Sequence, residues 1–323
     1  MRGWWRDLTD LVMPAECGGC GRPRAVLCDG CRAALVGAAP CRVRPEPEPA
    51  GLPAVHAAAP YTDEVRAVLL AHKERGALPL AAPLGEALAG AVRAALEAAL
   101  PPCPAERYAA PQGRSGRGRG VGAGEREGWK AGGPSGRRAG PADGPVLLVP
   151  VPSARRVVRA RGHDPARRIA LAAAGELRRS GTPARVLGVL RQRRAVADQA
   201  GLNSRQRLAN LSGALEVSAG GARLLARGGP VVLVDDLMTT GASLTEAARA
   251  VRVGRAAAQR AGVARAGSEG RGPRGRRGRW HGPEVPEVDR RIAGRGQARG
   301  TEGDVVGSAV VAAPSDAFEI NRN

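Results

Sequence analysis

Residues 230–243 read Pro-Val-Val-Leu-Val-Asp-Asp-Leu-Met-Thr-Thr-Gly-Ala-Ser, and this stretch decides the fold class. The four apolar residues at 231–234, bounded by a proline, predict a buried strand. Asp235 and Asp236 stand at the carboxyl end of that strand. A small, hydroxyl-rich turn follows and leads into a predicted helix, so the stretch reads as a strand, an acid pair, a turn and a helix.

The turn after the strand has the chemistry of an anion site beside a sugar site. Backbone N–H groups at a helix N-terminus, together with the Thr240 and Ser243 hydroxyls, can bind a phosphate monoester. The two acids beside them can accept hydrogen bonds from the cis-diol of a ribose. A Walker phosphate loop is excluded, because the Gly-x-x-x-x-Gly-Lys pattern is absent. The plainer alternative is an acid-capped strand before a helix, which accounts for Ser243 and Asp236 but not for the whole set.

Apolar periodicity on both sides of this stretch predicts strands that alternate with helices. Helices are predicted over residues 3–13, 63–72, 80–100, 166–179, 205–211 and 244–251, and strands over 54–60, 146–151, 186–190, 231–236 and 308–314. The arginine-rich residues 154–165 are predicted to form a loop. Such alternation is typical of a parallel α/β sheet flanked by helices.

The composition allows a core of enzyme size but limits what fills it. The 323 residues are 43% hydrophobic and only 2% aromatic, so the core must consist of Ala, Leu and Val. The sequence has no run of 18 apolar residues, and Asp7 and Asp10 interrupt the apolar stretch 1–17. Both features argue against a transmembrane span and a signal peptide, and the expected location is the cytoplasm.

The 50 Lys and Arg residues outnumber the 30 Asp and Glu residues, for a formal net charge of +20. Residues 101–145 and 252–305 are low-complexity Arg/Gly segments, which we interpret as disordered inserts. In one interpretation, their arginines bind the phosphates of a nucleic acid, although only Trp129 and Trp280 could stack on bases. In the other, the segments reflect a high-GC coding bias or a wrongly assigned gene segment. Residues 153–194 hold 12 arginines against two acids, which suits an anionic small ligand as well as a polynucleotide.

Six cysteines are too few for a secreted disulfide scaffold in a chain of this length. Two CxxC pairs, separated by seven residues, contain Cys17, Cys20, Cys28 and Cys31. Four thiolates in this spacing predict a structural zinc site. The alternative, a redox pair, would require a βαβ context that this Gly/Pro-rich segment lacks. Cys41 and Cys103 have no partner spacing and are interpreted as incidental.

Residues 231–243 resemble the phosphoribosyl diphosphate (PRPP) binding motif of type I phosphoribosyltransferases in their apolar run, two acids and TTG turn. The flanks narrow the resemblance to the ComF family of competence-associated proteins. They are the CGGC and CDGC pairs, VPVPSARRVVRARGHDPARRIA at 149–170, Q-x-x-L-x-x-x-x-R-x-x-N at 199–210 and the tail 309–323. The resemblance covers residues 1–100, 145–252 and 306–323. It implies a type I phosphoribosyltransferase-like parallel sheet flanked by helices, with a small N-terminal zinc-knuckle module.

The resemblance also implies roles for individual residues. Asp235 and Asp236 would bind the ribose hydroxyls. The 5′-phosphate would be bound by Thr239, Thr240, Gly241, Ala242 and Ser243. The diphosphate, which leaves with Mg²⁺, would be bound by Arg155, Arg156 and Arg161. In this class the sugar carbon passes through an oxocarbenium-like transition state, so the enzyme stabilises the departing diphosphate and holds a nucleophile, and needs no base of its own.

Several positions keep two interpretations. The family commonly has an aromatic residue and an amide after Arg-Gly, whereas this chain has His163 and Asp164. The acid weakens the local positive field. The histidine is either a proton carrier or a solvated loop residue. Lys73 and Arg75 match a basic turn of the family and either reach the site or form surface ion pairs. A last set either lines an acceptor pocket or caps a helix: Gln199, Arg207 and Asn210.

The sequence is thus divided into an N-terminal helix with a four-cysteine zinc module (1–50), a helical part of the core (51–100), an insert (101–145), the phosphoribosyltransferase core (146–252), a second insert (253–305) and a C-terminal strand and tail (306–323). The expected function is binding of Mg·PRPP, with transfer of the phosphoribosyl group to an unknown acceptor. The alternative is a non-catalytic adaptor in DNA uptake that senses a phosphorylated ligand. The candidate partners are PRPP, single-stranded DNA or the DNA-uptake machinery, and a second copy of the chain.

Overall fold

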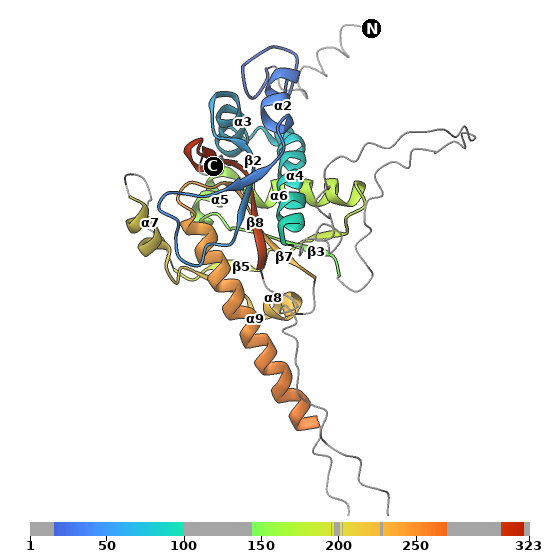
Figure 1. Cartoon of the computed structure of the whole chain (residues 1–323), viewed down its shortest axis with the longest axis vertical. Coiled ribbons are helices and arrows are strands. Elements are labelled where there is room, and N and C mark those ends of the chain that lie inside the picture. The colour runs from blue at the N-terminus through green and yellow to red at the C-terminus, as the bar shows by residue number, and fades with distance from the viewer. Residues whose placement is uncertain are drawn as a thin grey trace, which may run out of the picture.

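The centre of the molecule is a six-stranded, mostly parallel sheet (Figure 1). The computed structural model describes residues 16–99, 144–194, 196, 201, 203–226, 229–269 and 305–319. The strands in spatial order are β1 (Cys41–Val43), β2 (Val55–Pro60), β8 (Val305–Ala313), β7 (Val231–Leu237), β3 (Val146–Pro150) and β4 (Ala184–Val186). β1 is antiparallel to β2, and the other pairs are parallel. The mixed α/β class with a mostly parallel sheet is therefore confirmed.

Helices cover both faces of this sheet (Figure 1). One face packs against α2 (Asp29–Val36), α3 (Asp63–Glu74), α4 (Ala81–Ala99) and α6 (Pro165–Arg179). The other packs against α9 (Ala242–Glu269), with α8 (Ala219–Ala226) beside it. In β7, successive side chains point to opposite faces, and both faces are buried. Val232 and Val234 belong to the first core, and Val231 and Leu233 belong to the second.

Shorter elements surround the sheet. A two-stranded antiparallel pair, β5 (Leu190–Gln192) and β6 (Leu215–Val217), flanks α7 (Ser204–Leu211) in sequence and packs on α9. The 3₁₀ helix η1 (Leu78–Leu80) precedes α4, and α10 (Asp316–Glu319) follows β8. Within the described residues, no helix is both long and apolar enough to cross a membrane.

The predicted loop at 154–165 is wrong, because a helix, α5 (Arg155–Arg161), forms there. Arginine has a high helix propensity, and Gly162 ends the helix in the left-handed conformation with φ 77°. Asp164 then caps α6 by accepting a hydrogen bond from the Arg167 backbone N–H at 3.2 Å.

Three further predictions are corrected. The single strand predicted over 186–190 is wrong: β4 ends at Val186, and β5 starts at Leu190 in the other sheet. The helix predicted over 244–251 is too short, because α9 continues to Glu269. The interpretation of the second insert as disordered is therefore wrong for residues 252–269, which are helical. Alanine and arginine dominate this extension, and both favour helix. The other predicted strands and helices that fall on described residues lie where the sequence indicates, within a few residues at their ends.

Some predictions lie outside the described residues. They are the helix at 3–13, the insert at 101–143, the second insert beyond Glu269 up to residue 304, Cys103 and Gln199.

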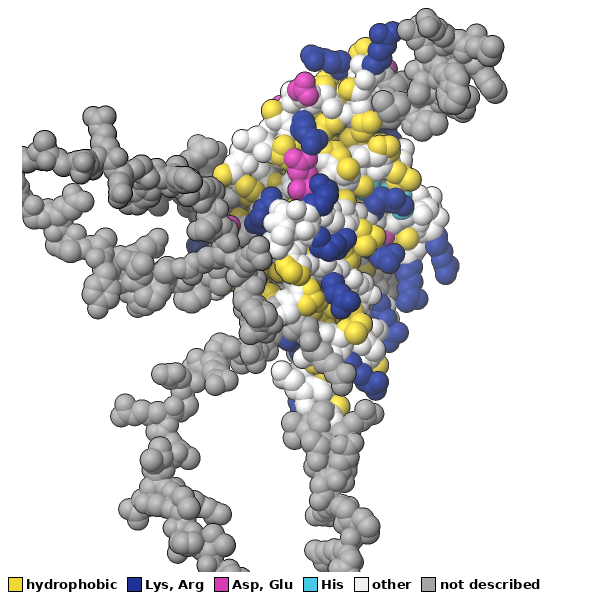
Figure 2. All heavy atoms as spheres, turned by 90° about the vertical axis from the view of Figure 1, so that its right-hand side faces the viewer, with side chains coloured by type: hydrophobic (Ala, Val, Ile, Leu, Met, Phe, Trp, Pro, Cys, Tyr) yellow, Lys and Arg dark blue, Asp and Glu magenta, His cyan; other side chains and the backbone are white. Residues whose placement is uncertain are grey.

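The space-filling view of the right-hand side of Figure 1 shows Lys and Arg side chains spread over that face with few acidic ones among them (Figure 2). This agrees with the net charge of +20.

Candidate functional site

The order of the strands points to the carboxyl ends of β3 and β7 as the candidate site. After β3 the chain crosses by α6 to β4 on one side, and after β7 it crosses by α9 to β8 on the other. The neighbouring strands β3 and β7 therefore send their connections in opposite directions. In open α/β sheets, ligands bind outside the carboxyl ends of the strands at such a switch point. The loops at this point are residues 151–154 and 238–241.

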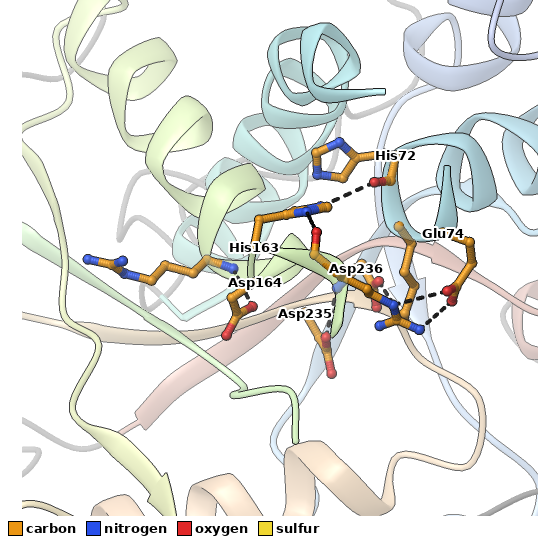
Figure 3. Close-up of polar contacts among 9 residues, drawn as sticks. His72, Glu74, His163, Asp164, Asp235 and Asp236 are labelled. Carbon is orange, nitrogen blue, oxygen red and sulfur yellow. Dashed lines mark hydrogen bonds and ion pairs between the residues drawn. The ribbon is translucent and has the colours of Figure 1, made fainter. Parts of the chain in front are cut away.

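Asp235 and Asp236 lie at the carboxyl end of β7 and point to opposite faces of the sheet. Asp236 is 6% exposed and forms an ion pair with Lys73 of α3, with 2.8 Å between Nζ and Oδ2. Asp235 is half-buried, and its Oδ1 accepts a hydrogen bond from the Asp236 backbone N–H at 2.9 Å. The close-up shows the two acids next to each other (Figure 3).

The electrostatics of this trio follow from burial and proximity. Burial, and then the charge of the adjacent Asp236 carboxylate, raise the pKa of Asp235 well above its ordinary value. Burial alone would lower the pKa of Lys73, but the Asp236 carboxylate outweighs it, and the net effect is a raised pKa. Lys73 is therefore a firmly protonated ammonium in contact with one acid of the pair.

The turn between β7 and α9 is held by backbone contacts. Gly241 adopts φ 72°, in the left-handed region that favours glycine. Its carbonyl oxygen accepts hydrogen bonds from the Thr245 backbone N–H and hydroxyl, at 2.9 and 3.0 Å. Leu52 packs directly over the turn, so that a Cβ at position 241 would lie 3.0 Å from its Cδ2. The first-turn N–H groups of α9 have no partners within the helix and are suited to an anion.

The hydroxyl groups predicted for the phosphate differ in access. Thr239 is exposed, while Thr240 and Ser243 are half-buried and Ala242 is buried. The structure thus brings the predicted residues 239–243 and the acid pair together at the end of one strand.

An arginine-rich cavity lies beside the loop that follows β3. It has a volume of about 300 Å³ and is lined by Ala154, Arg155, Arg156, Gln192, Arg193, Arg194 and Val196. Arg193 is oriented by an ion pair with Glu216, with 3.3 Å between Nε and Oε2. Arg194 donates from Nη2 to the carbonyl oxygens of Asn210 and Ser212, at 2.7 and 3.0 Å. Four guanidinium groups from two distant segments suit a multiply charged anion.

Sequence reasoning singled out Arg155 and Arg156 of this cavity but not Arg193 and Arg194. The only signal for the second pair was the density of arginine in 153–194, which does not say which side chains converge. Arg161 is not among the residues that line the cavity. It instead forms a two-point ion pair with Glu74 of α3, with its Nε 3.0 Å from Oε2.

Residues 161–164 have local structural roles. His163 is buried, and its Nε2 lies 3.3 Å from the His72 carbonyl oxygen and its Nδ1 3.2 Å from that of Arg161 (Figure 3). It is therefore not a solvated loop residue. Asp164 serves as the helix cap described above. Burial is the main reason that the pKa of His72 lies below its ordinary value.

The remaining candidates, Arg75, Arg207 and Asn210, differ in their contacts. Arg75 folds back on its own helix, with Nη2 3.5 Å from the Ala67 carbonyl oxygen. α7 is capped by Asn203 with Gln206, so that neither Arg207 nor Asn210 caps its start. The Asn210 carbonyl touches the arginine cavity through Arg194. The Arg207 Nε is buried and has no hydrogen-bond partner among the described residues.

The four predicted zinc ligands converge. The Sγ atoms of Cys17, Cys20, Cys28 and Cys31 all lie within 4.8 Å of one another. The Cys20 and Cys28 sulfurs are 3.6 Å apart, close to the separation of about 3.8 Å that tetrahedral Zn–S bonds of ~2.3 Å require. Burial opposes ionisation of Cys17, but backbone hydrogen bonds, that from Cys28 first, lower the pKa of its thiol to about 6. The cluster could therefore hold a metal ion such as zinc.

Comparison with known proteins adds no family. No protein-family model matches the chain. A search of curated proteins finds no match either. The chemistry of the site therefore rests on the placement of the acid pair, the glycine turn, the arginine cavity and the cysteine cluster.

Proposed function

We propose that this chain binds phosphoribosyl diphosphate as its Mg²⁺ complex at the carboxyl ends of β3 and β7, as a protein of the phosphoribosyltransferase type. The observation that carries the proposal is that the glycine turn and the first turn of α9 follow Asp235 and Asp236 closely in the chain, at a topological switch point of the sheet. One short stretch thus offers acceptors for two ribose hydroxyls next to donors for a 5′-phosphate. The ComF-like motifs support the same ligand.

The arginine cavity supports the diphosphate end of that ligand. Arg155 and Arg156 follow β3, the strand next to β7, and Arg193 and Arg194 line the same cavity. Fixed guanidinium groups that meet a charge developing in the transition state lower the barrier for its departure. The diphosphate carries its Mg²⁺ into the site as part of the substrate. In this proposal the protein's part in transfer is to hold the sugar and stabilise the leaving diphosphate, while an acceptor of unknown identity attacks the sugar carbon.

Calorimetric titration with Mg·PRPP tests the binding step. The wild-type chain should bind saturably. The Asp235→Asn/Asp236→Asn variant should bind at least about tenfold more weakly, because hydrogen bonds to charged acceptors contribute about 1.5–3 kcal/mol each. Glu97→Gln is the matched control: it removes one exposed carboxylate from the C-terminal end of α4, and its affinity should not change. Absence of saturable binding by the wild type would reject the proposal.

Release of diphosphate separates the enzyme from the adaptor. With bases and amines offered as acceptors, an enzyme releases diphosphate from PRPP, and the Asp236→Asn variant loses this release. Binding without release for any acceptor would favour the non-catalytic adaptor, in which the same site senses a phosphorylated ligand. A steep salt dependence of single-stranded DNA binding would then indicate contact with the phosphate backbone.

We also propose that the cysteine cluster holds a structural zinc ion. The four sulfurs fit the distances of a closed tetrahedral site, so the metal would fasten the segment 17–31 and take no part in transfer. Chain purified without added zinc should contain about one zinc per molecule. Cys31→Ser should lose the metal and melt at a lower temperature, whereas Cys41→Ser, outside the cluster, should keep both. A folded wild-type chain free of metal would contradict this proposal.

A further inference from the structure

Lysine is nearly absent from this chain, and one of its two lysines is at the candidate site. The sequence contains 48 arginines but only Lys73 and Lys130. Lys130 lies outside the described residues. The Lys73 Nζ is 2.8 Å from the Asp236 Oδ2, and the side chain of Lys73 is 33% exposed. Nearly all basic residues of this chain are arginines, so a lysine at the candidate site is unusual for this composition.

The two residues on either side of Lys73 in the sequence, His72 and Glu74, each contact another part of the chain (Figure 3). The His72 carbonyl oxygen contacts Nε2 of His163 at 3.3 Å, and the Glu74 carboxylate forms the two-point ion pair with Arg161. Three consecutive residues thus reach three separate partners, two of them in residues 161–163 and one in β7. These flanking contacts hold the last turn of α3 beside residues 161–163, so the backbone of Lys73 stays where its side chain can reach Asp236.

An ammonium and a guanidinium are not equivalent in this position. The ammonium is a compact point charge with three donors, whereas a guanidinium is a wide planar fork that tends to pair with both carboxylate oxygens at once. Lys73 contacts one oxygen of Asp236, Oδ2. Without this charge, the buried Asp236 carboxylate would lose its ion-pair partner, and carboxylate oxygens attract hard divalent cations.

We propose that Lys73 is the resident cation of the acid pair: it excludes free divalent metal ions and leaves the remaining carboxylate oxygens to accept hydrogen bonds from sugar hydroxyls. Lys73 is in this sense a positioning and specificity-determining residue. The hydroxyl half of the inference rests on the proposed function, whereas the exclusion of metal ions does not.

Titration of the zinc-loaded chain with Mn²⁺ alone, followed by electron paramagnetic resonance, tests this role. The wild type should show no Mn²⁺ site that depends on Asp236. Lys73→Met should gain one Mn²⁺ site, at least about tenfold tighter than any in the wild type, because the substitution removes a positive charge that repels Mn²⁺ and neutralises Asp236. Lys73→Arg, which keeps the charge, should restore exclusion. Lys73→Met/Asp236→Asn should lose the gained site. Equal Mn²⁺ binding by Lys73→Met and wild type, or a gained site that survives Asp236→Asn, would overturn the inference.

A second measurement does not require the Lys73→Met variant to fold. In a Lys130→Arg background, reductive ¹³C-methylation labels Lys73 and the N-terminal amine, and the two signals are assigned by Lys73→Arg. The Lys73 signal should shift in Asp236→Asn and stay sharp when Mn²⁺ is added. Broadening of this signal by Mn²⁺ at concentrations that leave the N-terminal signal sharp would place the metal at the acid pair and overturn the inference.

The two proposals fail separately. The Mn²⁺ experiments contain no PRPP, so they test the exclusion of metal ions by Lys73 independently of PRPP binding. Conversely, a chain that binds Mg·PRPP but admits free Mn²⁺ at Asp236 would keep the proposed function and reject the role of Lys73.

Discussion

At the scale of single residues, Gly241 controls the entry into α9. Its φ of 72° and the closeness of Leu52 both disfavour a side chain. The backbone N–H groups that face the proposed phosphate belong to the same turn, so a shift there would displace the donors as well as strain the chain.

Gly241→Ala should therefore lower the free energy of unfolding by about 1–2 kcal/mol and weaken Mg·PRPP binding. Urea denaturation and calorimetry measure the two effects. Gly220→Ala is the matched control: this glycine lies in α8, and an added Cβ meets nothing within 4 Å. It should leave affinity unchanged and keep or slightly raise stability. Equal stability and affinity of the Gly241→Ala and wild-type chains would show that the turn tolerates a side chain.

Buried histidines make stability depend on pH. The pKa of His72 lies below its ordinary value, chiefly because of burial, and the pKa of His56 is lowered for the same reason and by Arg42. Near pH 6 the unfolded chain then binds more protons than the folded one, so acid favours unfolding.

The contribution of these two histidines to the free energy of unfolding should accordingly be greatest above about pH 6.5, the ordinary histidine pKa, and fall as the pH drops below it. His72→Gln should flatten part of this decline between about pH 6.5 and 5.5, and His56→Gln a further part. Urea denaturation followed by circular dichroism at several pH values measures the slope. A slope unaltered by both substitutions would contradict the prediction.

At the scale of elements, the β5–β6 pair is attached to α9 by one buried acid. Glu246 accepts the Leu215 backbone N–H at 2.9 Å, and Arg249, bound to Glu246 at 2.7 Å, donates to the Leu215 carbonyl oxygen at 2.9 Å. Both backbone groups of Leu215 are thus paired with α9. Glu216, the next residue, orients Arg193 in the arginine cavity. The cavity therefore depends on how β6 docks on α9.

Glu246→Ala should lower the free energy of unfolding by about 1–3 kcal/mol, because it leaves a buried N–H without an acceptor. It should also weaken diphosphate binding, which isothermal calorimetry with Mg·diphosphate measures. Glu176→Ala is the control, since Glu176 forms the same i,i+3 pair with an exposed arginine, Arg179. Exposed pairs contribute little, about 0–1 kcal/mol. Similar losses in the two variants would contradict the role given to Glu246.

At the scale of the whole molecule, the sheet is closed late in the chain. β8 lies between β2 and β7 and pairs with both, so residues near the C-terminus complete the centre of the sheet. Its residues Ala309–Ala313 are fully buried. Without this strand, the N-terminal β1–β2 pair and the strands that carry the site would share no ladder.

A chain that lacks residues 305–323 should fail to fold, whereas one that lacks only 320–323 should match the full chain. Soluble yield and cooperative thermal unfolding are the measurements. The physical reason is that removal of β8 leaves two strand edges and two apolar faces without partners. Cooperative unfolding of the shorter chain would show that the sheet is stable without its central strand.

The sequence by itself determined the features that are local. The β7 strand, its two acids, the turn at 239–243 and the spacing of the four cysteines all lie within short stretches, where periodicity, turn residues and ligand spacing act directly. For the same reason it missed α5 and the full length of α9, where a polar arginine-rich run hides helix propensity behind a loop-like composition.

Only the tertiary structure decided which distant side chains meet. Lys73 reaches Asp236 because α3 packs on the same face of the sheet as the Asp236 side chain, and Arg161 turns to Glu74 instead of the cavity. Arg193 and Arg194 join Arg155 and Arg156 because the β5–β6 pair docks beside the end of β3. In a chain with 48 arginines, charge alone cannot select these partners. The folded backbone selects them, because it fixes which faces and strand ends are close enough for a contact.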